Sequence, residues 1–321
     1  MLDKNTKIYI AGHKGMAGSA IWRHLEKAGY TNLIGRTSEV LDLENQAAVE
    51  QFFSIEKPKA VIIAAAKVGG ILANREQPYD FLMKNLLIQN NLIDNAHRFG
   101  VENLIFLGSS CIYPKYCAQP IKEEYLLTGI LEPTNEPYAI AKIAGLKACE
   151  ALRNQFDKDF VSLMPTNLYG ERDNFDLNSS HVIPAMIRKF HEAKLKDHAS
   201  VHLWGTGTPM REFMYVKDLA SAVCFALENN LEEPVYNVGV GKDLSIKDLA
   251  IFIQKVTGHQ GEILWDTSKP DGTPRKLLDV QKLNALGWKA QTELEEGLEK
   301  TYKWFLKIGR ASCRERVSTS V

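Results

Sequence analysis

The sequence lacks the features that would point to a membrane or a nucleic acid. Its 321 residues carry 39 Lys and Arg against 39 Asp and Glu, so no basic excess favours an anionic partner. No uncharged apolar run reaches the roughly 18 residues that a membrane helix requires. The first residues show no apolar segment with a cleavage site of the kind that directs secretion. We therefore expect a protein that binds neither nucleic acid nor membrane.

Cysteine is scarce, and its spacing suits neither disulfides nor structural zinc. The five cysteines are odd in number and form no CxxC pair; they are Cys111, Cys117, Cys149, Cys224 and Cys313. Such usage is typical of a reducing compartment. The sequence therefore predicts a cytoplasmic location, free thiols and no metal site.

What the first half of the chain does have is an alternation of apolar runs and helix-period segments. We expect strands over 7–12, 33–35, 60–65, 104–107 and 160–164. The helical patterns between them cover 16–28, 46–55, 79–99 and 138–156. Continuous apolar strands that alternate with helices are typical of a parallel sheet covered on both faces. The expected fold is an α/β fold with a Rossmann-type, doubly wound parallel sheet.

The rhythm of the sequence changes after Pro165, where short strands, turn residues and scattered helices follow. We expect residues 1–166 to form the dinucleotide-binding domain, with part of 212–240 returning to it. Residues 167–308 should form mainly a smaller α/β domain for the substrate. The segment 309–321 shows neither helical nor strand periodicity, so we expect a non-native or disordered tail.

A glycine-rich turn joins the first expected strand to the first expected helix. Gly12, Gly15 and Gly18 form a GxxGxxG pattern. Glycine lets the backbone turn tightly and approach a pyrophosphate, whose charge lies at the helix N-terminus. A purely structural turn is the alternative. The residues assigned to the cofactor here are Gly12, His13, Lys14, Gly15, Met16, Ala17 and Gly18.

The end of the second expected strand favours NADP over NAD. A fold selective for NAD offers Asp or Glu to the ribose 2′-hydroxyl, whereas this chain has Gly35-Arg36-Thr37-Ser38. Arg36 and Lys14 together would form a positive pocket for a 2′-phosphate. The alternative is that both side chains are simply solvated.

Tyr138 and Lys142 are the first candidates for catalysis. Residues four apart share one face of a helix, and an ammonium near a phenol moves a pKa of about 10 toward the working pH. Such a phenol can give a proton to a carbonyl while a hydride arrives from a nicotinamide. Ser109 follows an expected strand at its carboxyl end, where open α/β sheets bind ligands, and its hydroxyl could share the carbonyl oxygen. The Tyr–Lys spacing alone also occurs by chance on solvated helices.

Cys111 and His181 stay ambiguous from residue type alone. Cys111 lies two residues after Ser109 and could face the same cleft, although a buried inert thiol is the commonest fate of a cytosolic cysteine. His181 begins an expected helix, where a lone histidine is more often a surface or capping residue.

Five longer strings surround these residues: AAAKVGGI at 64–71, LGSSCIYP at 107–114, EPTNEPYAIAKIAG at 132–145, MPTNLYG at 164–170 and KPDGTPRK at 269–276. They resemble the extended short-chain dehydrogenase/reductase family. Within that family they resemble the bifunctional epimerase/reductases that convert GDP-4-keto-6-deoxy-D-mannose to GDP-L-fucose. The resemblance covers about residues 7–306.

The resemblance implies epimerisation at C3 and C5, followed by NADPH-dependent reduction of the C4 ketone. It assigns Cys111 as the base and His181 as the opposing acid, residue types whose pKa values are adjustable to neutral pH. Tyr138 and Ser109 would hydrogen-bond the C4 oxygen, where charge develops. Lys142 would lower the pKa of Tyr138 and hold the nicotinamide ribose.

The resemblance also assigns cofactor and substrate contacts. The further NADP(H) residues it implies are Leu107, Gly108, Ser109, Ser110, Lys142, Pro165, Thr166, Asn167, Leu168 and His181. The GDP-sugar residues it implies are Lys189, Trp204, Arg211 and Asp271. Ser38 stands where some relatives carry Arg, which leaves Lys14 and Arg36 to hold the 2′-phosphate.

The helices expected over 79–99 and 138–156 carry apolar positions on more than one face. By resemblance they pair across a two-fold axis, so we expect a homodimer held by a four-helix bundle. Two other interpretations stay open: a sister nucleotide-sugar 4-epimerase or 4,6-dehydratase, and a non-catalytic NADP-binding regulator. The dehydratase typically has Thr-Asp-Glu where this chain has Ser109-Ser110-Cys111, and such regulators generally lose the Tyr or the Lys.

Overall fold

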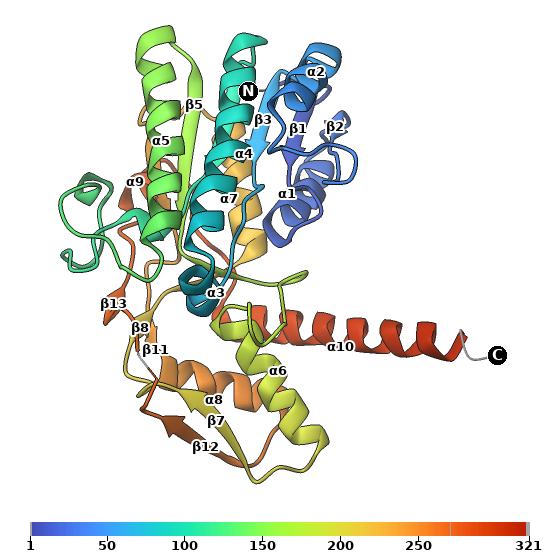
Figure 1. Cartoon of the computed structure of the whole chain (residues 1–321), viewed down its shortest axis with the longest axis vertical. Coiled ribbons are helices and arrows are strands. Elements are labelled where there is room, and N and C mark those ends of the chain that lie inside the picture. Colours follow the sequence, from blue (N-terminus) through green and yellow to red (C-terminus); the bar gives the residue numbers. More distant parts are fainter. Residues whose placement is uncertain (1, 270, 319–321) are drawn as a thin grey trace.

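The computed structural model describes residues 2–269 and 271–318, with side chains as far as Lys307. Its centre is a six-stranded sheet in the order β10-β5-β4-β3-β1-β2, in which every neighbouring pair is parallel (Figure 1). The strands are β1 (Ile8–Ala11), β2 (Leu33–Ile34), β3 (Ala60–Ile63), β4 (Asn103–Leu107), β5 (Asp159–Pro165) and β10 (Val235–Val238). The predicted fold class and the five predicted strands are confirmed.

Side chains of each strand alternate between two hydrophobic cores, one on each face of the sheet. In β1, Ile8 and Ile10 belong to one core, whereas Tyr9 and Ala11 belong to the other. This alternation follows from the two-residue period of a strand, and burial on both faces explains the continuous apolar runs. The covering helices are α1 (Met16–Lys27) and α7 (Val216–Glu228) on one face, and α2 (Gln46–Glu56), α4 (Pro78–Arg98) and α5 (Glu136–Phe156) on the other.

The segment 213–238 returns to the large sheet from the second half of the chain. Strand β9 (Phe213–Tyr215) pairs with β6 (Asn167–Tyr169), helix α7 packs on the sheet, and β10 then lies beside β5. This sheet edge is therefore built from residues far from β5 in sequence.

A third hydrophobic core belongs to the smaller part of the molecule, whose elements lie at the bottom of Figure 1. Its elements are α6 (Val182–Leu195), α8 (Ile246–Thr257), the parallel pair β7 (Ser200–Trp204) and β12 (Glu262–Asp266), and the first turns of α10 (Leu294–Ser318). Three short strands, β8 (Met210–Arg211), β11 (Leu244–Ser245) and β13 (Arg275–Lys276), form a separate sheet. The remaining helices are α3 (Ile71–Glu76), α9 (Gln281–Ala285) and the 3₁₀ turns η1 (Ser110–Ile112) and η2 (Glu123–Tyr125).

Residues 309–318, expected to belong to a non-native or disordered tail, are helical, and the non-native origin of the tail stays a prediction. Helix α10 continues through them to Ser318, and Figure 1 shows it projecting from the body of the molecule. Extending an existing helix adds one hydrogen bond per residue without a new nucleus, and after Gly309 the sequence has neither Gly nor Pro to stop it. Residues 319–321 lie outside the described residues.

Within the described part of the chain, no helix combines the length and the apolar character needed to cross a bilayer. The four cysteines whose side chains are described are free thiols: Cys111, Cys117, Cys149 and Cys224.

Candidate active site

A cavity of about 1260 Å³ lies where the carboxyl ends of the large sheet meet the smaller domain. Its wall includes residues that directly follow β1, β3 and β4, together with side chains of α6, β7 and β8. Every residue singled out from the sequence for catalysis, cofactor or substrate lines this one cavity. The structure thus brings the candidate residues together, while their roles stay proposals.

The glycine turn packs tightly against neighbouring backbone at the start of α1. Gly12 has φ of +82°, and a Cβ there would approach the Ala65 backbone nitrogen to 2.8 Å. A Cβ on Gly18 would collide with the Gly12 carbonyl oxygen. Helix α1 has no side-chain cap at Gly15 and no acidic residue in its first turn. Its first N–H groups therefore face the cavity as an anion site that fits a dinucleotide pyrophosphate.

The far end of the glycine turn is electropositive. Burial lowers the pKa of His13, and the charges of Lys14 and Arg36 lower it further. Arg36 is not free, because its guanidinium contacts a Glu56 carboxylate oxygen at 2.6 Å. Lys14 has no ion-pair partner among the residues with described side chains. Lys14 is thus the less compensated of the two charges expected to hold a 2′-phosphate.

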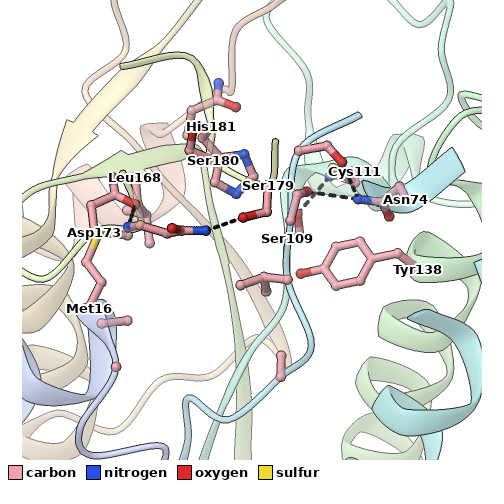
Figure 2. A pocket seen from close by; sticks show the side chains of 18 of the residues that line it. Met16, Asn74, Ser109, Cys111, Tyr138, Leu168, Asp173, Ser179, Ser180 and His181 are labelled. Carbon is pink, nitrogen blue, oxygen red and sulfur yellow. Dashed lines mark hydrogen bonds between the residues drawn. The ribbon is translucent and has the colours of Figure 1, made fainter. Parts of the chain in front are cut away.

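Tyr138 and Ser109 converge on the cavity from α5 and from the turn after β4. Figure 2 shows the phenol oxygen of Tyr138 directed toward the interior, next to Ser109. Burial and the charge of Cys111 raise the pKa of Tyr138 well above its usual range, while a hydrogen bond with Ser109 opposes the rise. The phenol therefore stays protonated at neutral pH.

The expectation that Lys142 lowers the pKa of Tyr138 is wrong for this geometry. Lys142 Nζ donates to the Leu107 carbonyl oxygen at 2.9 Å and lies 6.0 Å from the Tyr138 ring centroid. Lys142 is itself only 3% exposed, and burial lowers its pKa to about 8. The predicted four-residue spacing does place both side chains on one helix face, but desolvation dominates over their mutual charge effect.

Cys111 lies on η1, and its sulfur receives two side-chain contacts. Asn135 Nδ2 donates to Sγ at 3.2 Å, and Lys276 Nζ lies at 3.5 Å from the same atom. The backbone N–H of Cys111 donates to Ser109 Oγ at 3.2 Å, so the thiol and the serine share one short turn. The thiol is half-buried and lines the cavity, which decides against an inert core cysteine.

The opposite wall carries His181 and Asp173. In Figure 2 His181, Ser180 and Ser179 lie across the view from Cys111 and Tyr138. His181 is the N-cap residue of α6 but makes no side-chain capping bond; the residue is exposed and lines the cavity. This loop is tied to the large domain, because Gly70 N donates to the Ser179 carbonyl oxygen at 3.1 Å.

The four residues expected to bind substrate line the end of the cavity in the smaller domain. Lys189 Nζ and Lys269 Nζ each lie 5.7 Å from the ring centroid of Trp204, whose side chain is 56% exposed. Burial lowers the pKa of Arg211. Asp271 is already engaged by Thr206, whose N–H and hydroxyl donate to it at 2.7 and 2.8 Å. A flat exposed indole beside cations suits a nucleobase and its phosphates.

Sequence reasoning did not single out three residues of this site. Asn135 and Lys276 contact the Cys111 sulfur, and Asp173 lines the wall near Leu168. Burial raises the pKa of Asp173 to about 7, and one of its carboxylate oxygens has no hydrogen-bond partner among the described residues. Asn135 and Lys276 fall within strings that were recognised, but nothing in the sequence placed them against the thiol.

A parallel doubly wound sheet, a glycine turn at its first helix and a Tyr–Lys–Ser cluster at its carboxyl edge define a dinucleotide-binding α/β enzyme class. The chain belongs to the NAD dependent epimerase/dehydratase family, whose model matches residues 8–239. It is 56% identical over 300 residues to the GDP-L-fucose synthase of Sinorhizobium fredii, covering 94% of this chain and 95% of that one.

A second curated relative and a solved structure are also similar to this chain over nearly its whole length. The chain is 54% identical over 308 residues to the probable GDP-L-fucose synthase 1 of Oryza sativa, covering 96% of this chain and 94% of the relative. Among solved structures, it is similar to a GDP-L-fucose synthetase from Naegleria fowleri bound to NADP, with a TM-score of 0.88 and 29% identity. That match covers 97% of this chain and 95% of the other.

Proposed function

We propose that the protein converts GDP-4-keto-6-deoxy-D-mannose to GDP-L-fucose, by epimerisation at C3 and C5 and then reduction of the C4 ketone with NADPH. The single observation that supports this most is that one cavity holds both Tyr138 with Ser109 and the Cys111–His181 pair. The first pair is placed to hydrogen-bond the C4 carbonyl oxygen, and the second pair is placed to exchange protons at the carbons beside it. Relatives that cover nearly the whole chain at more than half identity are named for this activity.

NADP(H) fits the glycine turn, because Gly12–Gly18 line the cavity and the first turn of α1 has no acidic residue that would oppose an anion at its N-terminus. Lys14, and Arg36 with its Glu56 partner, would hold the 2′-phosphate. The other proposed NADP(H) residues begin at the last residues of β4 and β5 and run from Leu107 to Ser110 and from Pro165 to Leu168, with Lys142 and His181 in addition. When bound, the reduced cofactor supplies the hydride that reaches C4.

For epimerisation, we assign Cys111 as the base and His181 as the acid on the other face of the sugar. Cys111 Sγ takes the proton from the carbon beside the ketone, and the electron pair of the broken C–H bond moves onto the C4 oxygen. Tyr138 and Ser109 hydrogen-bond that oxygen as its charge develops. His181 then protonates the carbon from the opposite wall.

For reduction, Tyr138 gives its proton to the C4 oxygen. Burial keeps this phenol protonated until that moment. We assign the ammonium of Lys142, which donates to the Leu107 carbonyl oxygen at 2.9 Å, to hold the nicotinamide ribose. With a pKa of about 8, Lys142 carries its positive charge at neutral pH.

We propose that residues 1–166, with the returning part of 212–240, hold the cofactor, and that 167–308 mainly bind the GDP-sugar. Arg211 suits the diphosphate because it is a guanidinium on the cavity wall. Trp204, between Lys189 and Lys269, suits the guanosine end. Asp271 then acts mainly by holding the Thr206 loop against this site.

We also propose a homodimer formed through α4 and α5. These neighbouring helices carry exposed apolar side chains, including Tyr79 and Leu87 on α4 and Ile140 on α5. Leu87→Glu combined with Ile140→Glu should halve the mass measured by light scattering. Leu195→Glu, which changes an exposed leucine at the end of α6, is the control. A single-chain mass for the unaltered protein would contradict the dimer.

The free thiols and the NADPH requirement support a cytoplasmic location, which cell fractionation with an untagged chain would test. An activity confined to a secreted or periplasmic fraction would contradict it.

The central test mixes the protein with NADPH and the keto sugar. We expect loss of the near-ultraviolet absorbance of NADPH and formation of GDP-L-fucose. In deuterated water the product should carry label at C3 and C5. Tyr138→Phe should abolish NADPH consumption, whereas Tyr116→Phe, at a 79% exposed tyrosine, should not. Failure of the folded protein to oxidise NADPH would refute the reductase, and unlabelled product would refute the epimerase.

A further inference from the structure

Two cations lie side by side near the Cys111 sulfur. Strands β8 and β13 are parallel neighbours, and Arg211 is the register partner of Lys276. Paired residues on adjacent strands point to the same face of a sheet. Lys276 Nζ is 3.5 Å from Cys111 Sγ. Burial lowers the pKa of Arg211, and the charge of Cys111 opposes that change by raising it. The thiol therefore faces a positive strip that the smaller domain supplies.

Asn135 completes this arrangement from the other side. It is the residue before α5, and its Nδ2 donates to the same sulfur at 3.2 Å. Its Oδ1 is buried and makes no hydrogen bond among the described residues. Among the described residues, the side-chain amide of Asn135 therefore contacts the sulfur through Nδ2, while Oδ1 makes no hydrogen bond. Two donors from distant parts of the chain converge on one sulfur atom.

A thiolate accepts hydrogen bonds strongly, whereas a thiol accepts them weakly. Half-burial of Cys111 works against the thiolate, because desolvation disfavours the charged form. An ammonium at 3.5 Å works for it, and so does the amide donor. Among the residues with described side chains, Lys276 forms no salt bridge with a carboxylate that would compensate its charge.

We propose that Lys276, assisted by Asn135, is the positioning residue that holds Cys111 as a thiolate and thereby makes it a base. This inference rests on the proposed function for its chemical meaning. The thiolate sulfur forms an S–H bond with the proton of the carbon beside the ketone, while the C–H electron pair moves to the C4 oxygen. Lys276 keeps its own protons throughout. The proton on sulfur afterwards leaves to solvent, which restores the thiolate for the second centre.

The test measures the thiolate directly and needs no substrate. Alkylation of Cys111 by iodoacetamide is followed across pH by mass spectrometry of the peptide that contains it. Lys276→Met should move the midpoint of this profile upward by about one pH unit or more, a roughly tenfold slower alkylation at neutral pH, given a charge pair at 3.5 Å. Lys276→Arg should keep the profile close to that of the unaltered protein.

Lys242→Met is the matched control, because Lys242 is an exposed lysine of the same half of the chain. Lys276→Gln serves as the second neutral variant, and thermal unfolding checks that each variant is folded. An unchanged midpoint in the folded neutral variants would overturn the proposal. An equal shift in Lys276→Arg would also overturn it, because charge would then not be the cause.

Deuterium uptake at C3 and C5 separates this inference from the proposed function. The pH profile of uptake should shift in Lys276→Met in the same direction as the alkylation profile. If alkylation shifts but the unaltered protein shows no uptake, the function fails while the thiolate assignment stands. If uptake occurs with the proposed product but alkylation does not shift, the function stands and the role of Lys276 is refuted.

Discussion

We expect the charge of Lys142 to lower the free energy of unfolding while the same residue is required for reduction of the keto sugar. Its side chain is 3% exposed, and burial lowers its pKa from 10.5 to about 8. At about 1.4 kcal/mol per pH unit, holding this ammonium in the folded protein costs about 3 kcal/mol below pH 8. Lys142→Met keeps a stem of similar length beside Phe106 and removes the charge.

The gain is partly offset by a lost hydrogen bond. Without Lys142 Nζ, the Leu107 carbonyl oxygen loses the donor 2.9 Å away, and an unpaired buried carbonyl costs about 1–3 kcal/mol. The net expectation at neutral pH is a variant more stable by about 0–2 kcal/mol. The same variant should lose NADPH-dependent reduction of the keto sugar, an example of activity maintained against stability.

The pH dependence identifies the cause. Below pH 8, Lys142 is charged in both the folded and the unfolded chain, so its cost is fully present. Between pH 8 and 10.5 only the unfolded chain keeps the proton, so stability of the unaltered protein rises with pH. Urea unfolding near pH 7 and near pH 10 should therefore show the advantage of Lys142→Met shrinking at the higher pH. A variant that is less stable near pH 7, or a difference independent of pH, would refute the reasoning.

Three further predictions concern the same cavity. Gly18→Ala places a Cβ against the Gly12 carbonyl oxygen, so NADPH affinity measured by fluorescence should fall at least about tenfold; normal affinity would contradict the glycine cradle. Lys14→Ala should weaken NADPH far more than NADH in the same assay, because Arg36 is already neutralised by Glu56, and equal losses would contradict the 2′-phosphate site. Asp173→Asn should stabilise the protein by up to about 4 kcal/mol above pH 7, since burial raises the pKa of the carboxyl from 3.8 to about 7. Because the folded chain keeps that proton and the unfolded chain releases it, thermal unfolding should show this gain growing from pH 4 to 8, and a constant difference would count against it.

The sheet and the local motifs could be predicted because their causes are local in sequence. A strand buried on both faces must be continuously apolar, so β1, β3 and β4 are visible as runs. The glycine turn is likewise visible because close backbone approach excludes every side chain at Gly12 and Gly18.

What the sequence could not predict depends on long-range packing. Lys276 reaches Cys111 across 165 residues of chain, through a pairing of β13 with β8 only two residues long. A pairing that short has no periodicity to detect. The same holds for the pKa of Tyr138, because the helical spacing gives the position of Lys142 but not how deeply both groups are buried.

On the proposed function, the short turn after β4 explains how two reactions use one bound sugar. Ser109 Oγ accepts the N–H of Cys111 at 3.2 Å, so the group assigned to the C4 oxygen and the base assigned to the neighbouring carbons belong to one short hydrogen-bonded turn. The proposal assigns Tyr138, on α5, to the same oxygen, and Asn135 in front of that helix contacts the Cys111 sulfur. Both the enolate and the final alkoxide form at this oxygen. A sugar held by its C4 oxygen therefore meets the base, the acid and the hydride without being released between steps.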